Sequence, residues 1–324
     1  MRQLRIEAFL IICLLLGLLP FAASAGDGAG SNAADFLAMP VGARDLALAG
    51  AASALPGDLS AAFHNPALLS TEGGNQIQIG HQQWYQGLRF ETLMAATSLP
   101  GRLGRVALHC RYLHLDPIPV FDSAMEQVDE ASVYDMALGV SYATRLARRL
   151  DVGFSVYNVR QHLAGDEASG WAFDLGSGFV ASGFYMTAAL RNLGGDIEYD
   201  DGERYDLDRE LSIGVARFFP RTGMTLSAEY SQPRSWGSTL NSGVEYLFAD
   251  RLVLRAGYSQ LLENVGDIPG QLNFGTGIRV SSFSLDYSFR SNEFLGEVHA
   301  ISIRLLGGGS LSPYKFFRPT LGNN

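Results

Sequence analysis

From residue 75 onward, apolar and polar residues alternate along the chain in short segments. In FSLDYSFR, residues 283–290, every odd-numbered position is Phe, Leu or Tyr and every even-numbered position is polar. The stretch MTLSAEYS, residues 224–231, alternates in the same way. A period of two places neighbouring side chains on opposite faces of a β-strand, so this pattern predicts strands with one apolar face. A soluble β-sandwich would give the same alternation, so the pattern alone leaves two kinds of fold open.

The lengths of the segments and of the connections between them favour a membrane barrel. Most segments have about 9–13 residues, close to the ~10 that a tilted strand needs to cross a bilayer and longer than is usual in soluble sheets. From the third connection on, long connections such as 117–131 and 194–208 alternate with short ones such as 147–149 and 182–183. Short turns at one end and longer loops at the other are typical of an up-and-down transmembrane barrel. We predict fourteen strands, at residues 75–83, 89–98, 105–116, 132–146, 150–162, 169–181, 184–193, 209–219, 223–233, 238–248, 251–260, 271–280, 283–291 and 297–305.

The predicted fold is therefore all-β, a 14-stranded antiparallel transmembrane β-barrel over residues 75–306. An even number of strands returns the chain to the side on which the first strand began, as in bacterial single-chain barrels. Residues 307–324 are left as a C-terminal tail.

The first 25 residues have the pattern of a cleaved signal peptide. Arg2 and Arg5 precede an apolar run over 8–22, which is followed by the small residues Ala23-Ser24-Ala25. The run is too short to span a bilayer comfortably. We expect an exported protein that begins near residue 26 and lies in the cell outer membrane.

Residues 26–74 differ from the rest of the mature chain because they are rich in alanine and lack alternation. Pro40, Pro56 and Pro66 divide this region into pieces too short to form independent helices. The stretch SAAFHNPALLS, residues 60–70, ends it with Asn65-Pro66, which removes a backbone donor and disfavours helix at Asn65. We expect a fixed bend there before the first strand. The bend is a structural corner in one interpretation and a gate in the other.

Composition and charge exclude several functions. The net charge of −9 argues against nucleic acid as a partner, because phosphate backbones bind basic surfaces. Cys13 falls in the signal peptide, so Cys110 remains alone and no intrachain disulfide is expected. The six histidines show no zinc-ligand spacing, and no nucleophile elbow or phosphate loop is found. We expect no enzyme, cofactor or metal site, although a scattered Ser/His/Asp site stays open. The acidic residues of 195–208 are interpreted as a solvated loop rather than a calcium site.

The N-terminal region resembles the start of the PorV/PorQ family of outer-membrane barrels. Gly42-Ala43-Arg44, Ala47, Gly50 and Ala52 match one family motif, and Asp58, Ser60-Ala61 and Asn65-Pro66-Ala67 match a second. His64 stands where the family usually has an aromatic residue, with Phe63 one place earlier. The closing stretch from Leu295 to Ser302 is similar to the family's last strand. This group is in turn similar to the long-chain fatty-acid channel FadL, a fourteen-stranded barrel with an N-terminal luminal plug.

The resemblance implies a FadL-like fold in which residues 26–74 form a plug or hatch inside the barrel. It also implies a PorV-like role in protein export, as in type IX secretion, with secretion-apparatus subunits or secreted cargo as partners. A FadL-like passive channel for long-chain fatty acids or other hydrophobic small molecules is the alternative, and a structural barrel without transported ligand is a third. In each case outer-membrane lipid and lipopolysaccharide surround the barrel.

Three sets of residues are candidates for function. The plug or gate motif comprises Gly42, Arg44, Gly50, Asp58, Asn65, Pro66 and Ala67. Candidate contacts for a hydrophobic ligand are Phe36, Leu37, Leu46, Leu48 and Phe63. Charges expected to point into the lumen are Asp135, Asp174, Glu229, Glu245, Arg255, Arg279, Asp286, Arg290 and Arg304. Because these charges have mixed signs, we expect ion pairs that fill the barrel or anchor the plug, with Arg44 paired to one of the inward carboxylates; a selective ion pathway is the alternative.

Overall fold

A computed structural model of the chain describes residues 32–101, 103–200, 202–235, 237–262, 270–292 and 295–307. The expected signal peptide, residues 1–25, lies outside the described residues. So does the tail beyond residue 307.

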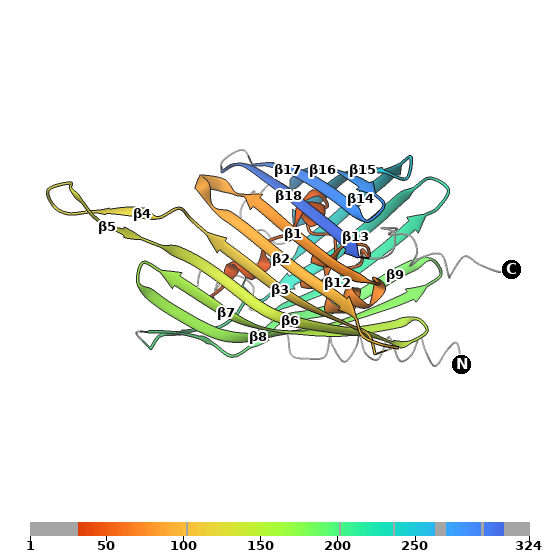
Figure 1. The fold of residues 1–324 in the computed structure, drawn as a ribbon, viewed down its shortest axis with the longest axis horizontal. Coiled ribbons are helices and arrows are strands. Elements are labelled where there is room, and N and C mark those ends of the chain that lie inside the picture. The colour runs from red at the N-terminus through yellow and green to blue at the C-terminus, as the bar shows by residue number, and fades with distance from the viewer. Residues whose placement is uncertain are drawn as a thin grey trace.

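Fourteen antiparallel strands form a closed barrel (Figure 1), as the sequence predicts. Each strand pairs with the next around the barrel, β1 pairs with β18, and pairing of β8 with β9 completes the closure. The barrel strands are β1 (Asn75–Gln83), β2 (Arg89–Ser98), β3 (Arg105–His114), β6 (Val133–Ala147), β7 (Leu150–Leu163), β8 (Asp166–Ala181), β9 (Phe184–Gly194), β12 (Glu210–Phe219), β13 (Met224–Pro233), β14 (Thr239–Phe248), β15 (Leu252–Leu261), β16 (Gln271–Val280), β17 (Phe283–Asn292) and β18 (Gly296–Gly307).

The apolar residues of the strands face outward and the polar residues face inward. On β1, Ile77 and Ile79 are about half exposed, whereas Gln76, Gln78 and Gln82 are buried. Most other strands show the same tendency, although some inward positions, such as Phe90 and Tyr157, are apolar; exposed apolar residues on the outside are typical of a barrel surrounded by lipid. The apolar residues of the sequence alternation therefore correspond to an apolar belt on the outside of the barrel.

Two of the long connections contain strands that the sequence prediction missed. The connection between β3 and β6 forms a separate hairpin of β4 (Ile118–Phe121) and β5 (Gln127–Ala131), which extends beyond the barrel (Figure 1). The connection between β9 and β12 contains β10 (Ile197–Tyr199) and β11 (Arg204–Tyr205), which lengthen the sheet beside β8. We call the end of the barrel with these connections the long-loop end and the opposite one the short-turn end.

The residues before β1 form short helical turns rather than long helices. They are η1 (Asp35–Ala38), α2 (Ala43–Ala47), η2 (Leu59–Phe63) and η3 (Pro66–Thr71); a further turn, η4 (Tyr85–Gly87), follows β1. Asp58 caps η2 by accepting a hydrogen bond from the backbone N–H of Ser60 at 2.9 Å. Among the described residues, no helix is long and apolar enough to cross a membrane.

Asn65 and Pro66 start a helical turn instead of leading directly into the first strand. Asn65 is the N-cap of η3 and accepts from Ala67 N–H at 3.0 Å, while Pro66 occupies the first helical position, where its missing N–H costs nothing. The entry into β1 follows η3, at residues 72–74, where Gly74 has a φ of 73°. The expected corner into the first strand therefore comes one helical turn later than the sequence suggests.

Candidate functional site

Residues 32–71, the N-terminal segment, pack against the inward faces of the strands. Helix α2 contacts β15 to β18, and η3 contacts β3, β6, β7 and β8. From residue 41 to residue 69 every residue except Gly50 is buried. The segment thus touches opposite parts of the wall, and Figure 1 shows its turns within the barrel.

On one side the segment meets a network of buried charges. Arg44 donates from Nε and Nη2 to the two carboxylate oxygens of Glu245 on β14, both at 2.8 Å. Arg255 on β15 donates to the same carboxylate at 2.7 Å and to Asp286 on β17 at 2.6 Å. Arg279 approaches Glu245 at 4.0 Å. One wall carboxylate therefore holds the segment's arginine within a network that spans several strands.

A second polar contact lies beside this network. Asp58 accepts from Ser60 Oγ and from Gln78 Nε2 on β1, each at 2.6 Å, and Arg304 on β18 donates to the carbonyl oxygen of Gly57. Burial opposes ionisation of the Asp58 carboxyl, but the nearby Arg304 and Arg44 hold its pKa below the ordinary value. Asp58 is thus a charged anchor of the segment to the wall.

The other side of the segment is apolar. Phe36, Leu37 and Phe63 belong to one buried cluster with wall residues such as Phe90 and Tyr157. Arg111 on β3 enters this cluster with its guanidinium 5.0 Å from the ring centroids of both Phe63 and Tyr157, a cation–π distance. The segment therefore meets a network of ion pairs on one side and packs mainly against apolar and aromatic side chains on the other.

Two wall glycines make room for Asn65 and Pro66. A Cβ at Gly153 on β7 would lie 2.5 Å from the carbonyl carbon of Pro66, and one at Gly176 on β8 would overlap the Asn65 side chain. Asn65 Nδ2 also donates to the carbonyl oxygen of Ser177 on β8 at 3.0 Å. The motif is therefore fixed to the wall by close backbone contact, which is why glycine is needed opposite it.

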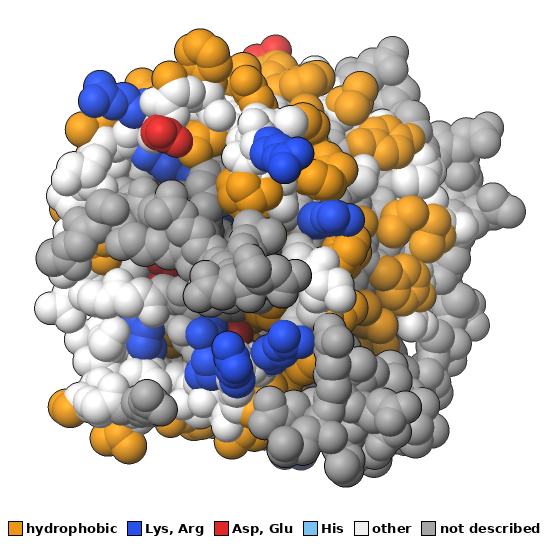
Figure 2. All heavy atoms as spheres, turned by 90° about the vertical axis from the view of Figure 1, so that its right-hand side faces the viewer, with side chains coloured by type: hydrophobic (Ala, Val, Ile, Leu, Met, Phe, Trp, Pro, Cys, Tyr) orange, Lys and Arg blue, Asp and Glu red, His pale blue; other side chains and the backbone are white. Residues whose placement is uncertain are grey.

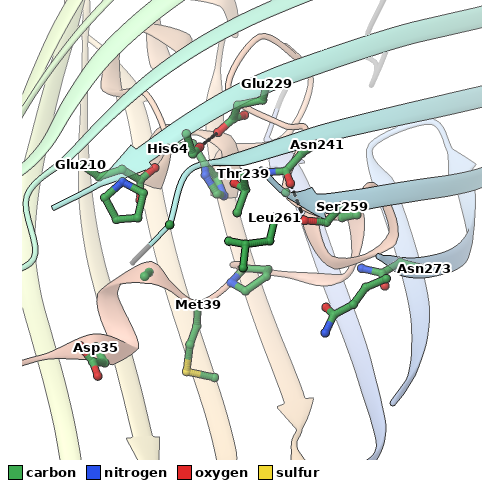
Figure 3. Close-up of a pocket in the computed structure, with 18 of the residues that line it drawn as sticks. Asp35, Met39, His64, Glu210, Glu229, Thr239, Asn241, Ser259, Leu261 and Asn273 are labelled. Atoms are coloured by element: carbon green, nitrogen blue, oxygen red, sulfur yellow. Dashed lines mark hydrogen bonds between the residues drawn. The ribbon is translucent and has the colours of Figure 1, made fainter. Parts of the chain in front are cut away.

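A cavity of about 390 Å³ lies between the segment and the wall at the long-loop end (Figure 3). Asp35, Met39 and His64 line it from the segment, and the wall side includes residues at the ends of strands, such as Thr239 and Leu261. Figure 3 shows His64 and Glu229 on one side of this space and Met39 on the opposite side. The lining combines apolar side chains such as Met39 and Leu261 with a larger number of polar ones, which include the carboxylates of Asp35, Asp208, Glu210 and Glu229.

Arg290 gives the cavity a cationic group. It is 9% exposed, its guanidinium lies 4.6 Å from the Trp84 ring centroid, and Nη2 donates to Tyr85 Oη at 3.2 Å. Within the described part of the chain, no carboxylate lies within ion-pair distance of Arg290, and its Nε has no hydrogen-bond partner. A buried arginine without a carboxylate is costly, so this group is suited to an anion that enters the cavity.

The remaining expected luminal charges form hydrogen bonds rather than ion pairs. Asp135 accepts from Gln161 at 2.9 Å, Asp174 accepts from Tyr157 Oη at 2.9 Å, and Glu229 accepts from Ser53 N–H at 2.9 Å. Only Glu229 among these three touches the N-terminal segment directly through such a bond. The expected ion pairs are thus concentrated in the part of the wall that faces Arg44.

The five residues expected to contact a hydrophobic ligand are all buried. Phe36, Leu37 and Phe63 pack on the apolar side, while Leu46 and Leu48 belong to two smaller clusters. None of the five is among the residues that line the cavity. Met39, Trp84 and Arg290 do line it, and sequence reasoning marked only Arg290, as a general luminal charge.

The other motif residues lie where the segment touches the wall. Gly42 and Gly50 flank α2 with φ values of 85° and 87°, a region that favours glycine. Ala43 N–H donates to Ser302 Oγ on β18 at 2.8 Å, and Asn273 on β16 donates to the Leu46 carbonyl oxygen at 2.6 Å. Within the described residues, no group of three or more His, Cys, Asp or Glu could hold a metal ion.

Comparison with solved structures places this architecture beside FadL-like channels. The toluene transporter TbuX of Ralstonia pickettii matches with a TM-score of 0.58 at 14% identity, covering 82% of this chain and 98% of TbuX. A FadL homologue of Pseudomonas aeruginosa matches with a TM-score of 0.58 at 13% identity over the same shares. The monoaromatic hydrocarbon channel CymD matches with a TM-score of 0.61 at 14% identity, covering 82% of this chain and 97% of CymD.

At these identities the likeness establishes the fold, and the chain has a FadL-like barrel. No protein-family model and no curated protein sequence matches the chain. The resemblance to PorV and PorQ thus remains a resemblance of motifs.

Proposed function

We propose that the chain is an outer-membrane channel for hydrophobic small molecules, held closed by its N-terminal segment. The observation that carries this proposal is the combination of a FadL-like barrel, a segment buried across its lumen and a partly apolar cavity at the long-loop end. The apolar outer belt supports placement in a membrane. Three similar structures are described as hydrocarbon channels, toluene transporters or FadL homologues.

Arg290 favours a substrate with an anionic group. Its guanidinium is stacked on Trp84 and forms no ion pair with any described carboxylate, and Met39 and Leu261 offer apolar surface in the same space. A fatty acid combines these two chemistries, whereas a neutral hydrocarbon would use the apolar surface only. We therefore propose long-chain fatty acids or similar apolar carboxylates as substrates.

The role in protein export receives no support from the comparisons. The similar structures reported above are described as channels or transporters for small molecules, and the cavity is of small-molecule size. A structural barrel without ligand is the remaining alternative, and it predicts no binding at the cavity.

Binding by the purified full-length protein tests the proposal. Titration with a radiolabelled long-chain fatty acid should give saturable binding. Arg290→Gln should weaken it about tenfold to a hundredfold, since a hydrogen bond to a charged group contributes about 1.5–3 kcal/mol. Binding of toluene should be nearly unchanged in the same variant.

Arg160→Gln serves as the control, because Arg160 is exposed on the outer face of β7 and does not line this cavity. Liposomes with the reconstituted protein should also take up fatty acid faster than empty liposomes. Absence of saturable binding and of uptake for both ligand types would overturn the channel proposal and favour the structural barrel.

A further inference from the structure

We propose that the short-turn end of the barrel carries an arginine collar that binds the phosphate groups of glycerophospholipids in the adjacent leaflet. The collar consists of Arg148, Arg149, Arg217, Arg221 and Arg251. This inference concerns the outer surface of the barrel and is independent of any cargo in the lumen.

Three turns at the short-turn end carry four of these arginines. Arg148 and Arg149 form the turn between β6 and β7, Arg221 lies between β12 and β13, and Arg251 lies between β14 and β15. Around the wall the strands from β6 to β15 follow in the order β6, β7, β8, β9, β12, β13, β14 and β15. The arginines of the collar therefore lie along one part of a single rim and are not spread over the whole barrel.

The position of Arg217 indicates how deep the collar lies in the membrane. It follows Ile213 and Val215 on the outward face of β12, both of which are exposed apolar residues. Its guanidinium lies 4.7 Å from the Phe184 ring centroid and 5.0 Å from that of Phe219. Aromatic residues that flank an apolar belt lie at the level of the lipid head groups. Arg217 is thus at the height where lipid phosphates are found.

The arginines of the collar are exposed and available. Within the described part of the chain, none of the five forms an ion pair with a carboxylate. The described acidic residues near this rim are Glu72, Asp250 and Asp151, and Asp151 is buried and paired with Arg145. Figure 2, which looks onto this end, shows several arginine side chains and few acidic ones.

The long-loop end has the opposite charge. The hairpin of β4 and β5 carries Asp122, Glu126, Asp129 and Glu130 and contains no Lys or Arg. The connection with β10 and β11 is acidic as well. Anionic head groups are therefore attracted to one rim of the barrel and repelled from the other.

Phosphate is the ligand chemistry that fits the collar. Arginine binds phosphate oxygens through parallel N–H donors, and an arginine near an anionic membrane surface gains about fivefold in affinity. The rim that continues the apolar belt contacts lipid, so the source of the phosphate is a glycerophospholipid rather than a soluble anion. Lipopolysaccharide belongs to the opposite leaflet if the long loops face outward, as in bacterial barrels.

Native mass spectrometry of the full-length protein tests the collar. The protein in neutral detergent is titrated with phosphatidylglycerol, phosphatidylcholine or lipid A, and the bound lipids are counted. The wild-type protein should retain more phosphatidylglycerol than phosphatidylcholine, and less at 1 M salt because exposed charges are screened. The variant with Arg148, Arg149, Arg221 and Arg251 changed to Gln should lose at least tenfold in apparent affinity for phosphatidylglycerol.

The control is Arg160→Gln, which removes one outward arginine near the opposite rim. It should retain phosphatidylglycerol like the wild-type protein, and all variants should show the same shift of the folded band on unheated gels. Equal phosphatidylglycerol binding by the fourfold variant would overturn the proposal. So would a preference for lipid A, or equal retention of the charged and neutral lipids by the wild-type protein.

Discussion

Arg44 and Glu245 lie 201 residues apart in the chain and form a two-point ion pair in the lumen of the barrel. Arg44 belongs to helix α2 of the N-terminal segment, and Glu245 belongs to β14 of the wall. Because Glu245 also binds Arg255, the pair joins the segment to a network within the wall. Any opening of the lumen through movement of α2 has to break this pair.

Glu245→Gln should destabilise the closed barrel more than Arg44→Met. The first change leaves Arg44, Arg255 and Arg279 around a neutral amide, whereas the second leaves Glu245 still bound to Arg255. Breaking a buried ion pair costs about 3–5 kcal/mol, and we expect the two variants near the upper and lower ends of that range. The free energy of unfolding in urea, measured on the reconstituted protein, checks the order.

The same pair also predicts a change in permeability. Arg44→Glu should raise the uptake of fatty acid by proteoliposomes, because two carboxylates would face each other across the contact. The exchanged variant with Arg44→Glu and Glu245→Arg should return uptake toward the wild-type level. Uptake that stays the same in Arg44→Glu would show that α2 is not part of the gate.

Gly153→Ala should displace the Asn65-Pro66 turn. The added Cβ would lie 2.5 Å from Pro66, too close for the backbone to remain in place. Strain of this kind in a packed interior costs about 1–3 kcal/mol. The matched control is Gly195→Ala, because nothing lies within 4 Å of a Cβ there. A lower unfolding midpoint for Gly153→Ala alone is expected; equal midpoints would show that the turn can shift freely.

The raised pKa of His64 predicts that the N-terminal segment packs less stably at alkaline pH. Burial lowers the pKa of this imidazole, but Asp45 at 2.6 Å raises it by more, so the net pKa lies above the ordinary value of 6.5. Of the other facing groups, Arg191 lowers the pKa and Glu229 raises it. A raised pKa stabilises the folded state fully below pH 6.5, and that stabilisation is lost as the pH rises through the folded pKa.

Unfolding midpoints between pH 5 and pH 9 measure this effect. The wild-type protein should lose stability toward the alkaline end, while His64→Gln should lose the part of the slope that belongs to the imidazole. An identical slope in both proteins would assign the pH dependence to other groups.

Cysteine labelling tests which end of the barrel faces outward. Met125, at the tip of the β4–β5 hairpin, is 78% exposed, and Thr222 is exposed in a turn at the opposite end. In a Cys110→Ser background, Met125→Cys should react with a membrane-impermeant maleimide on intact cells. Thr222→Cys should react only after the outer membrane is permeabilised. The reverse pattern would invert the orientation and the assignment of the collar to its leaflet.

The strands could be predicted because each carries its own signal. β1, β2 and β16 begin and end at the predicted residues, since alternation and turn residues are local properties. The hairpin of β4 and β5 could not be predicted in this way, because its sequence lacks a clear alternation and it pairs only with itself.

The site was less predictable than the fold. A pairing of Arg44 with an inward carboxylate was expected, yet only the closed barrel selects Glu245 from several candidates on different strands. The expected ligand contacts Phe36, Leu37 and Phe63 are apolar residues of the segment, and these pack into the core instead of lining the cavity. Hydrophobicity identified them as buried but could not distinguish packing from ligand contact.

The sequence by itself determined which residues of each strand face lipid and which face the lumen, because a period of two follows from the backbone of a single strand. Tertiary structure alone decided where those inward residues meet the N-terminal segment. The registers of strands far apart in the chain decide how closely Asn65 and Pro66 pack against Gly153 and Gly176. They also decide how much space is left beside Arg290. Such registers are set only when the barrel closes, so no local pattern contains them.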